Sequence, residues 1–288
     1  MILVTGAAGK TGRAIIRRLV DRGRGVRAFV RTEEQRKDLL ALGAQQTMLG
    51  DLSNRDDIEQ ALEGIGSVYH ICPNVDPSEV EYAELMIEAS VRAGVRQFGY
   101  HSVLHSQTES MPHHWRKLRV EELLFESGLP FSIMQPCAYM QNLLSQQRSL
   151  MNEGVIRLPY STKAKFSLVD LEDVAAAVAA VLSEPCHLGA IYELAGPEIL
   201  DHEQVAAMIS AELGQPVRAE QIGLAEWERT ARSAGMGDYQ ISALLSMFNY
   251  YERSGFWGNS NVLAFLLGRR PMSFEGFLRR EFSALVGR

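Results

Sequence analysis

Apolar runs of strand length alternate with amphipathic segments of helical period along the first half of the chain. The first run, residues 1–4, is followed by a glycine-rich stretch and then by a helical segment. In that segment Ile15, Ile16 and Leu19 form an apolar side, and Arg17 lies on the opposite side. This pattern predicts a strand, a turn and a helix in immediate succession.

The same alternation continues to about residue 140. We expect further strands at residues 25–30, 46–49, 67–72, 97–103 and 131–135. We expect helices at residues 33–42, from Ser53 onward, at 79–93 and at 113–127, with Thr32 capping the first of these. Regular alternation of strands and helices predicts a parallel sheet with helices on both faces, which is an α/β, Rossmann-type doubly wound fold.

The pattern is looser from residue 141 onward, and a second, smaller lobe is expected there. Its predicted elements are short strands at 155–158 and 166–169, a helix at 171–182, a strand at 190–194, a helix at 201–213 capped by Asp201, and mostly helical structure over 224–285. We therefore predict a dinucleotide-binding domain at 1–142, to which 171–195 returns. Residues 143–170 and 196–288 would form a mostly helical lobe that covers the substrate.

Glycines at a spacing of three occupy the turn after the first strand. Gly6, Gly9 and Gly12 allow a tight turn, close approach of backbone N–H groups to a diphosphate, and close packing of helix on strand. A helix N-terminus placed after such a turn binds phosphate well. The residues expected to contact a dinucleotide here are Gly6, Ala8, Gly9, Lys10, Thr11 and Gly12.

Ligands of doubly wound sheets bind beyond the carboxyl ends of the strands, so residues just after each strand are further candidates. They are Arg31, Asp51, Leu52, Cys72, Pro73 and Pro136. Arg31 stands near the place where NAD-specific folds carry an acidic residue, and a guanidinium suits the 2′-phosphate of NADP. We therefore favour NADP(H) over NAD(H). Asp51 is equally well explained as a loop residue beside Ser53, and Cys72 as a small buried apolar residue.

Composition limits the partners. The 288 residues carry a formal net charge of −6, which gives no general support for nucleic-acid binding. Three cysteines without C-x-x-C spacing favour a reducing compartment. No leader precedes the first strand and no apolar stretch is long enough to cross a membrane, so a cytoplasmic location without a membrane partner is expected. The oligomeric state is left open, a homo-oligomer included.

Several motifs resemble the NmrA-like group of atypical short-chain dehydrogenases/reductases. They are residues 4–12 (VTGAAGKTG), 101–105 (HSVLH), 117–121 (KLRVE), 127–133 (SGLPFSI), Gln135-Pro136, Val169-Asp170, 173–175 (DVA) and 192–197 (YELAGP). The resemblance covers roughly residues 1–217. It implies an NADPH-dependent oxidoreductase with a Rossmann fold.

The wider superfamily reduces carbonyls with Ser, Tyr and Lys, the last two in a Y-x-x-x-K pair on one helix. By this resemblance Lys117 is the lysine and would contact the nicotinamide ribose, while Ser102 would hydrogen-bond the substrate oxygen. His113 stands where the tyrosine is usual, and it is our candidate for the general acid. His105 and His114 lie nearby, but the spacing lacks a metal-binding pattern, so no metal is expected.

Three functions remain in view. The first is hydride transfer from NADPH to a quinone, carbonyl or other conjugated acceptor, for which a small apolar or aromatic substrate is expected. The second is a non-catalytic NADP(H) sensor that acts through a protein partner, which the absent tyrosine favours. The third, oxygenation of an aromatic polyketide, has no support from particular residues. The aromatic-rich segment 224–285 suits either a substrate pocket or ordinary helix packing, and a mobile lid is suggested around Phe256-Trp257.

Overall fold

A computed structural model describes residues 1–282 of the chain. The described residues form two compact units. The first unit comprises 1–107, 113–135 and 174–192, and the second comprises 108–112, 136–173 and the remainder from 193 onward. The last six positions of the predicted C-terminal lobe, 283–288, which include the end of the predicted helical segment, lie outside the described residues.

A seven-stranded sheet in the order β10-β6-β5-β4-β1-β2-β3 forms the centre of the first unit. The strands are β1 (Ile2–Val4), β2 (Val26–Val30), β3 (Gln46–Leu49), β4 (Ser67–His70), β5 (Gln97–His101), β6 (Phe131–Pro136) and β10 (Ala190–Leu194). All pairings from β3 through β6 are parallel. The order reverses between β1 and β4, which is the switch point where ligands of doubly wound sheets bind. The predicted Rossmann-type fold is confirmed.

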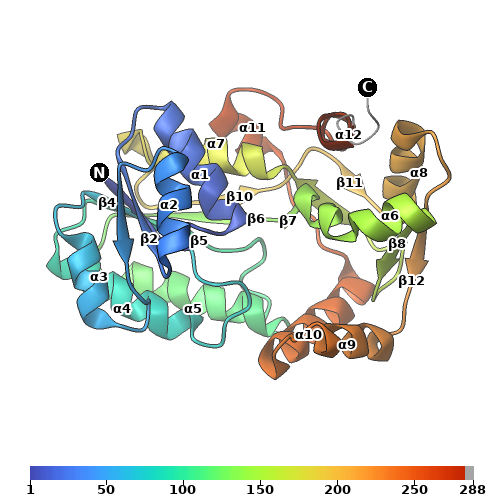
Figure 1. Cartoon of the computed structure of the whole chain (residues 1–288), viewed down its shortest axis with the longest axis horizontal. Coiled ribbons are helices and arrows are strands. Elements are labelled where there is room, and N and C mark those ends of the chain that lie inside the picture. The colour runs from blue at the N-terminus through green and yellow to red at the C-terminus, as the bar shows by residue number, and fades with distance from the viewer. Residues whose placement is uncertain (283–288) are drawn as a thin grey trace. The chain divides into compact units, whose positions relative to one another are not determined.

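Helices cover both faces of this sheet (Figure 1). They are α1 (Lys10–Asp21), α2 (Glu33–Ala41), α3 (Arg55–Leu62), α4 (Glu79–Arg92), α5 (Pro112–Glu126), α7 (Leu171–Val181) and the short 3-10 helix η2 (Pro185–His187). The apolar sides of α3, α4 and α5 share one buried core with the sheet, in which Ile58, Met86 and Val120 meet Val68 and Phe98. This core holds one face of the sheet rigidly beneath its strand ends.

The strand expected over 97–103 ends at His101. Two further predicted boundaries are wrong because side chains provide hydrogen bonds to the backbone there. The strand expected over 67–72 ends at His70, since Ile71 exchanges hydrogen bonds with the side chain of Thr5 instead. The helix expected from Ser53 begins at Arg55, because the Asn54 side chain accepts the N–H groups of the first turn and is the true N-cap.

The second unit is mostly helical, as predicted, and also contains short strands. Its strands are β7 (Ala138–Tyr139), β8 (Val155–Leu158), β9 (Phe166–Val169), β11 (Ile199–Leu200) and β12 (Arg218–Gln221). Its helices are η1 (Met140–Gln146), α6 (Gln147–Glu153), α8 (His202–Leu213), α9 (Leu224–Ser233), α10 (Asp238–Ser254), α11 (Asn261–Leu267) and α12 (Phe274–Phe282). β12 was not expected, because its polar sequence has no strand alternation; it forms by parallel pairing with β8.

The segment around Phe256-Trp257, suggested above as a lid, makes backbone hydrogen bonds to neighbouring residues. Phe256 donates its N–H to Lys165 O at 2.7 Å and accepts the N–H of Ser167 at 3.0 Å. Gly255 has φ +64°, and a Cβ there would lie 2.5 Å from Lys165 O. Phe256 is buried, whereas Trp257 is half exposed. These backbone bonds join Phe256 to the start of β9 and do not favour a lid at this segment.

Within residues 1–282, no helix combines the length and the apolarity that a membrane span requires. The structure leaves Cys72, Cys137 and Cys186 as free thiols.

Candidate functional site

The turn between β1 and α1 is built for glycine. Gly6 adopts φ +56°, and a Cβ on it would lie 2.8 Å from Ile71 O. A Cβ on Gly12 would lie 2.4 Å from Gly6 O and 2.7 Å from Ala7 Cα. The Gly9 N–H donates to Gly6 O at 3.1 Å and closes the turn. Backbone therefore occupies the space where any larger residue would place its side chain.

The N-terminus of α1 is left open for an anion. Gly9 is its N-cap and offers no side-chain acceptor, and its first turn contains no acidic residue. The N-terminal end of the dipole of this 12-residue helix therefore favours a negative group. Lys10 and Thr11 are its first two residues, and Ala8 O is taken by the Arg13 side chain at 2.9 Å. The turn thus fits the diphosphate of a dinucleotide.

Thr5 connects this turn to the end of β4. Its hydroxyl donates to Ile71 O at 3.1 Å, accepts the Ile71 N–H at 2.8 Å and lies 3.0 Å from His70 Nδ1. Burial and then the Lys117 charge lower the pKa of His70 to about 3, so this ring is neutral. Neither residue was singled out from sequence, because the contact spans more than sixty positions.

The next strand ends carry exposed polar side chains. Arg31 follows β2 directly and is exposed, with its N–H bonded to Gln35 Oε1 at 3.0 Å. Asp51 is exposed after β3, and its Oδ1 accepts both the hydroxyl and the N–H of Ser53. These bonds, followed by the Arg31 charge, lower the pKa of Asp51. Leu52 packs against the core. Asp51 thus has a local structural role, and Arg31 is close enough to act on it electrostatically.

Cys72 and Pro73 follow the end of β4, as the sequence predicts. Cys72 is buried, and burial followed by the Glu79 charge raises the pKa of its thiol. A protonated thiol packs as a small apolar group, so the structure agrees with the interpretation of Cys72 as a small buried apolar residue. Pro136 is the last residue of β6.

Lys117 lies in a buried network that centres on Glu79. Lys117 Nζ is 2.5 Å from Glu79 Oε1 and donates to His101 O at 3.1 Å. The Tyr100 hydroxyl donates to the same Glu79 oxygen at 2.8 Å. Glu79 is fully buried, and it was missed from sequence because it lies 38 positions from Lys117. The pairing of Glu79 with Lys117 can be recognised only once the fold has placed α4 against α5.

His113 lies one helical turn before Lys117 on α5. Its Nδ1 is 3.9 Å from Glu79 Oε2, an oxygen without a hydrogen-bond partner among the described residues. Burial, then the Lys117 and His114 charges, hold the pKa of His113 well below 6.5. The expected lowering by lysine is present, but burial is the larger cause. His113 is therefore a neutral imidazole at pH 7, and only its neutral N–H is available as a proton source.

Ser102 is engaged within the protein. It follows β5, is buried, and its hydroxyl donates to Glu121 on α5. Gln135 also donates to Glu121, at 2.9 and 3.1 Å, and to Ser106 at 3.2 Å. Because its hydrogen is given to Glu121, Ser102 can accept a hydrogen bond but must exchange a partner before donating one. Glu121 is a further residue that sequence reasoning did not assign a role.

The structure places the three catalytic candidates on α5 and beside it. His113 and Lys117 repeat with Glu121 at intervals of four on α5 and share one helix face, and Ser102 bonds to Glu121. Their partners come from the start of α4, the end of β5 and β6. The glycine turn lies at the end of β1, the neighbour of β4 in the sheet.

The chain belongs to the NmrA-like family, which matches residues 1–278. It is 29% identical over 285 residues, or 99% of both chains, to the NAD(P)H azoreductase of Xenophilus azovorans. It is 33% identical to a (4-alkanoyl-5-oxo-2,5-dihydrofuran-3-yl)methyl phosphate reductase of Streptomyces griseus, covering 91% of this chain and 90% of that one.

Solved structures agree with this placement. The NADPH-dependent quinone oxidoreductase of Escherichia coli, in complex with NADPH, superposes with a TM-score of 0.87 at 25% identity, covering 98% of this chain and all of the other. The predicted family, Rossmann-type fold and oxidoreductase class are confirmed, and the glycine turn is consistent with NAD(P)H binding.

Proposed function

We propose that this protein is an NADPH-dependent reductase that passes a hydride to a small apolar or aromatic acceptor, with quinones as the first acceptors to test. The observation that carries the proposal is the open N-terminus of α1 behind a turn where Gly6 and Gly12 leave no room for a side chain. Its reductase relatives and their named acceptors, an azo compound and a quinone, support the same class.

In this proposal Gly6, Gly9 and Gly12 hold the diphosphate through backbone N–H groups, and Arg31 binds the 2′-phosphate. Bound NADPH would supply the hydride. Lys117, held by Glu79, would bind ribose hydroxyls beside the nicotinamide. His113 is the protein's candidate proton donor. A quinone suits a site whose histidine is neutral, because the reduced oxygens can take their protons from water.

The cofactor preference is tested by calorimetry with NADPH and NADH on the wild type and on Arg31→Ala. Wild type should bind NADPH more tightly, and Arg31→Ala should weaken NADPH binding by about tenfold or more, the effect of a charged hydrogen bond, while leaving NADH unchanged. Arg36→Ala is the matched control, because Arg36 makes an exposed pair with Glu33 at 3.3 Å. Tighter binding of NADH by the wild type would refute the NADP preference.

A second function, redox sensing without turnover, is favoured by one specific observation. The groups expected to perform chemistry already have internal partners: Ser102 donates to Glu121 and Lys117 is paired with Glu79. NADPH oxidation measured over a panel of quinones and aldehydes separates the two functions. Turnover supports the reductase, whereas tight NADPH binding without turnover, together with recovery of a specific protein in a pull-down, supports the sensor.

A further inference from the structure

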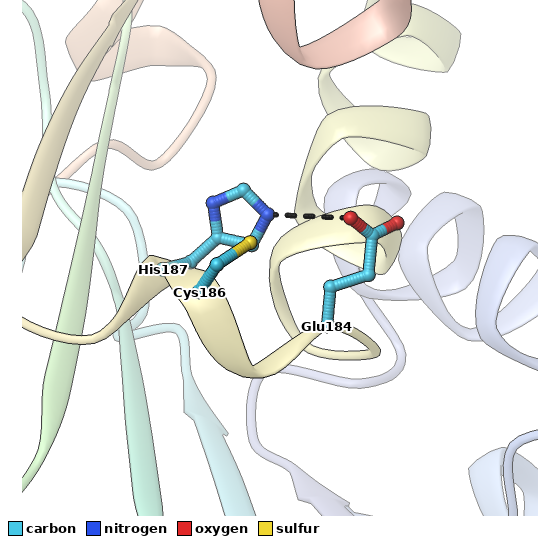
Figure 2. A group of neighbouring side chains, drawn as sticks. All are labelled: Glu184, Cys186 and His187. Carbon is cyan, nitrogen blue, oxygen red and sulfur yellow. Dashed lines mark ion pairs between the residues drawn. The ribbon is translucent and has the colours of Figure 1, made fainter.

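The turn between α7 and β10 gathers three metal-ligating side chains. Glu184, Cys186 and His187 offer one ligand atom each, and these atoms all lie within 4.8 Å of one another. Figure 2 shows the Glu184 carboxylate facing the His187 ring, with the Cys186 sulfur beside that ring. Glu184 and Cys186 are exposed, and His187 is buried, so an ion from solvent has access from the outer side.

A buried nitrogen in this cluster has no hydrogen bond. His187 is 7% exposed, and its Nε2 is buried without a hydrogen-bond partner among the described residues. Glu184 Oε2 faces it at 3.6 Å, which is too far for a hydrogen bond. An unsatisfied buried polar atom costs free energy, so a third group between this nitrogen and the carboxylate would be stabilising.

The other ring nitrogen is placed as in a metal-bound histidine. His187 Nδ1 lies 2.8 Å from the hydroxyl of Tyr192. When Nδ1–H donates to that hydroxyl, the lone pair of Nε2 points away from it, toward Glu184. Histidine ligands of metals are commonly oriented by such a hydrogen bond from the second nitrogen.

The backbone of the turn is anchored independently of the cluster. Ser132 donates its hydroxyl to His187 O at 2.8 Å, and the Gly189 N–H donates to Phe131 O at 2.7 Å. Arg22 lies 3.4 Å from Glu184 Oε1, so the other oxygen of that carboxylate remains directed at His187. The turn is thus held by contacts to β6, and the Glu184 carboxylate by Arg22 at the C-cap of α1.

We propose that Glu184, Cys186 and His187 bind one Zn²⁺ ion, with a water molecule as the fourth ligand. One sulfur, one imidazole nitrogen and one carboxylate oxygen form a donor set that zinc prefers. Tetrahedral ligands at about 2.0–2.3 Å from zinc lie roughly 3.3–3.8 Å apart, so small side-chain rotations complete the site. On binding, the Cys186 thiol loses its proton to solvent and coordinates as the thiolate. The site does not depend on the reductase function.

Titration of the full-length protein with Zn²⁺, in competition with a chromogenic chelator, tests the proposal. Wild type should bind one equivalent, and Cys186→Ser should weaken binding at least tenfold. Tyr192→Phe should weaken it by about 10- to 100-fold, the usual effect of losing a group that orients a ligand. His105→Asn is the matched control. It removes a histidine from the histidine-rich segment 101–114, outside the proposed site, and its affinity for Zn²⁺ should equal that of wild type.

Cobalt substitution gives a readout at the ligand itself. Wild type with Co²⁺ should show the thiolate-to-cobalt charge-transfer absorption, and Cys186→Ser should lose it. Because Cys186 is exposed, the metal-free variant should keep the circular dichroism and melting temperature of the wild type. Absence of zinc binding, undiminished affinity in Cys186→Ser, or loss of affinity in His105→Asn would each overturn the proposal.

Discussion

At the scale of single residues, one buried carboxylate lies beside two candidate catalytic side chains. Glu79 is fully buried, its Oε1 is shared by Lys117 and Tyr100, and its Oε2 lies 3.9 Å from His113. A buried ion pair adds little net stability over an apolar pair, but removing one partner leaves an uncompensated charge. Glu79 therefore holds Lys117 in place, and we expect mutations of Lys117 to affect stability as well as the proposed activity.

Because Lys117 and Glu79 form a buried pair, a test of Lys117 has to measure stability and activity together. Lys117→Met should lower the free energy of unfolding by about 3–5 kcal/mol, because Glu79 is left buried without its partner. The double variant Lys117→Met/Glu79→Gln should recover part of that loss, because the remaining buried group is uncharged. Both variants should oxidise NADPH more slowly than wild type.

Urea unfolding gives the stabilities, and initial rates with a quinone give the activities. The double variant separates the two effects, since a slow rate in a stable protein cannot come from unfolding. A wild-type rate in the double variant would dismiss a cofactor role for Lys117. Equal stability of Lys117→Met and wild type would contradict the buried pair.

At the scale of elements, β1, the turn and α1 form one unit whose geometry depends on close backbone contact. The Cβ position of Gly12 lies against Gly6 O and Ala7 Cα, both of which belong to the turn. A side chain there has to push the helix away from the turn. The same displacement would move the N–H groups that are expected to hold the diphosphate.

Gly12→Ala should therefore lose stability and cofactor binding together. Overpacking of this kind costs about 1–3 kcal/mol, and NADPH binding should fall below detection by calorimetry. Gly25→Ala is the control, because a Cβ there would meet only the amide oxygen of Gln45, at the end of a flexible side chain. A Gly12→Ala protein that binds NADPH like wild type would show that the turn is not the diphosphate site.

At the scale of the whole molecule, buried and half-buried histidines contribute to the response to acid. The pKa is lowered to about 3 in His70 and His101, and to about 4 in His114 and His202, in each case chiefly by burial. The unfolded chain binds these protons at about pH 6.5. Between about pH 6.5 and 4 only the unfolded state is protonated at these rings, so stability falls as the pH falls through this window.

Each such histidine should contribute up to about 1.4 kcal/mol per pH unit in the window. His202→Phe tests this, because the ring packs on Tyr160 and Phe166 and its buried Nδ1 has no hydrogen-bond partner among the described residues. Urea unfolding from pH 7 to 5 should show a shallower loss of stability in the variant. An unchanged slope would exclude His202 from the acid response.

Local patterns were enough to predict the sheet, the family and the strand–turn–helix unit. The period of apolar residues and the spacing of Gly6, Gly9 and Gly12 are properties of short stretches, and they follow from backbone geometry within those stretches. The position of Arg31 after β2 follows in the same way. Boundaries were missed where a distant or capping side chain intervened, as with Thr5 at the end of β4 and Asn54 at the start of α3.

The sequence by itself thus determined the strand–turn–helix pattern and the strand ends at which we expect a dinucleotide, because each strand end is marked by residues next to it in the chain. Only the tertiary structure decided which charges meet. Packing of α4 beside α5 brings Glu79 to Lys117, and the end of β5 brings Ser102 to Glu121. The reason is physical: burial makes an unpaired charge or hydroxyl costly, and the partner that removes this cost is chosen by the fold rather than by its position in the chain.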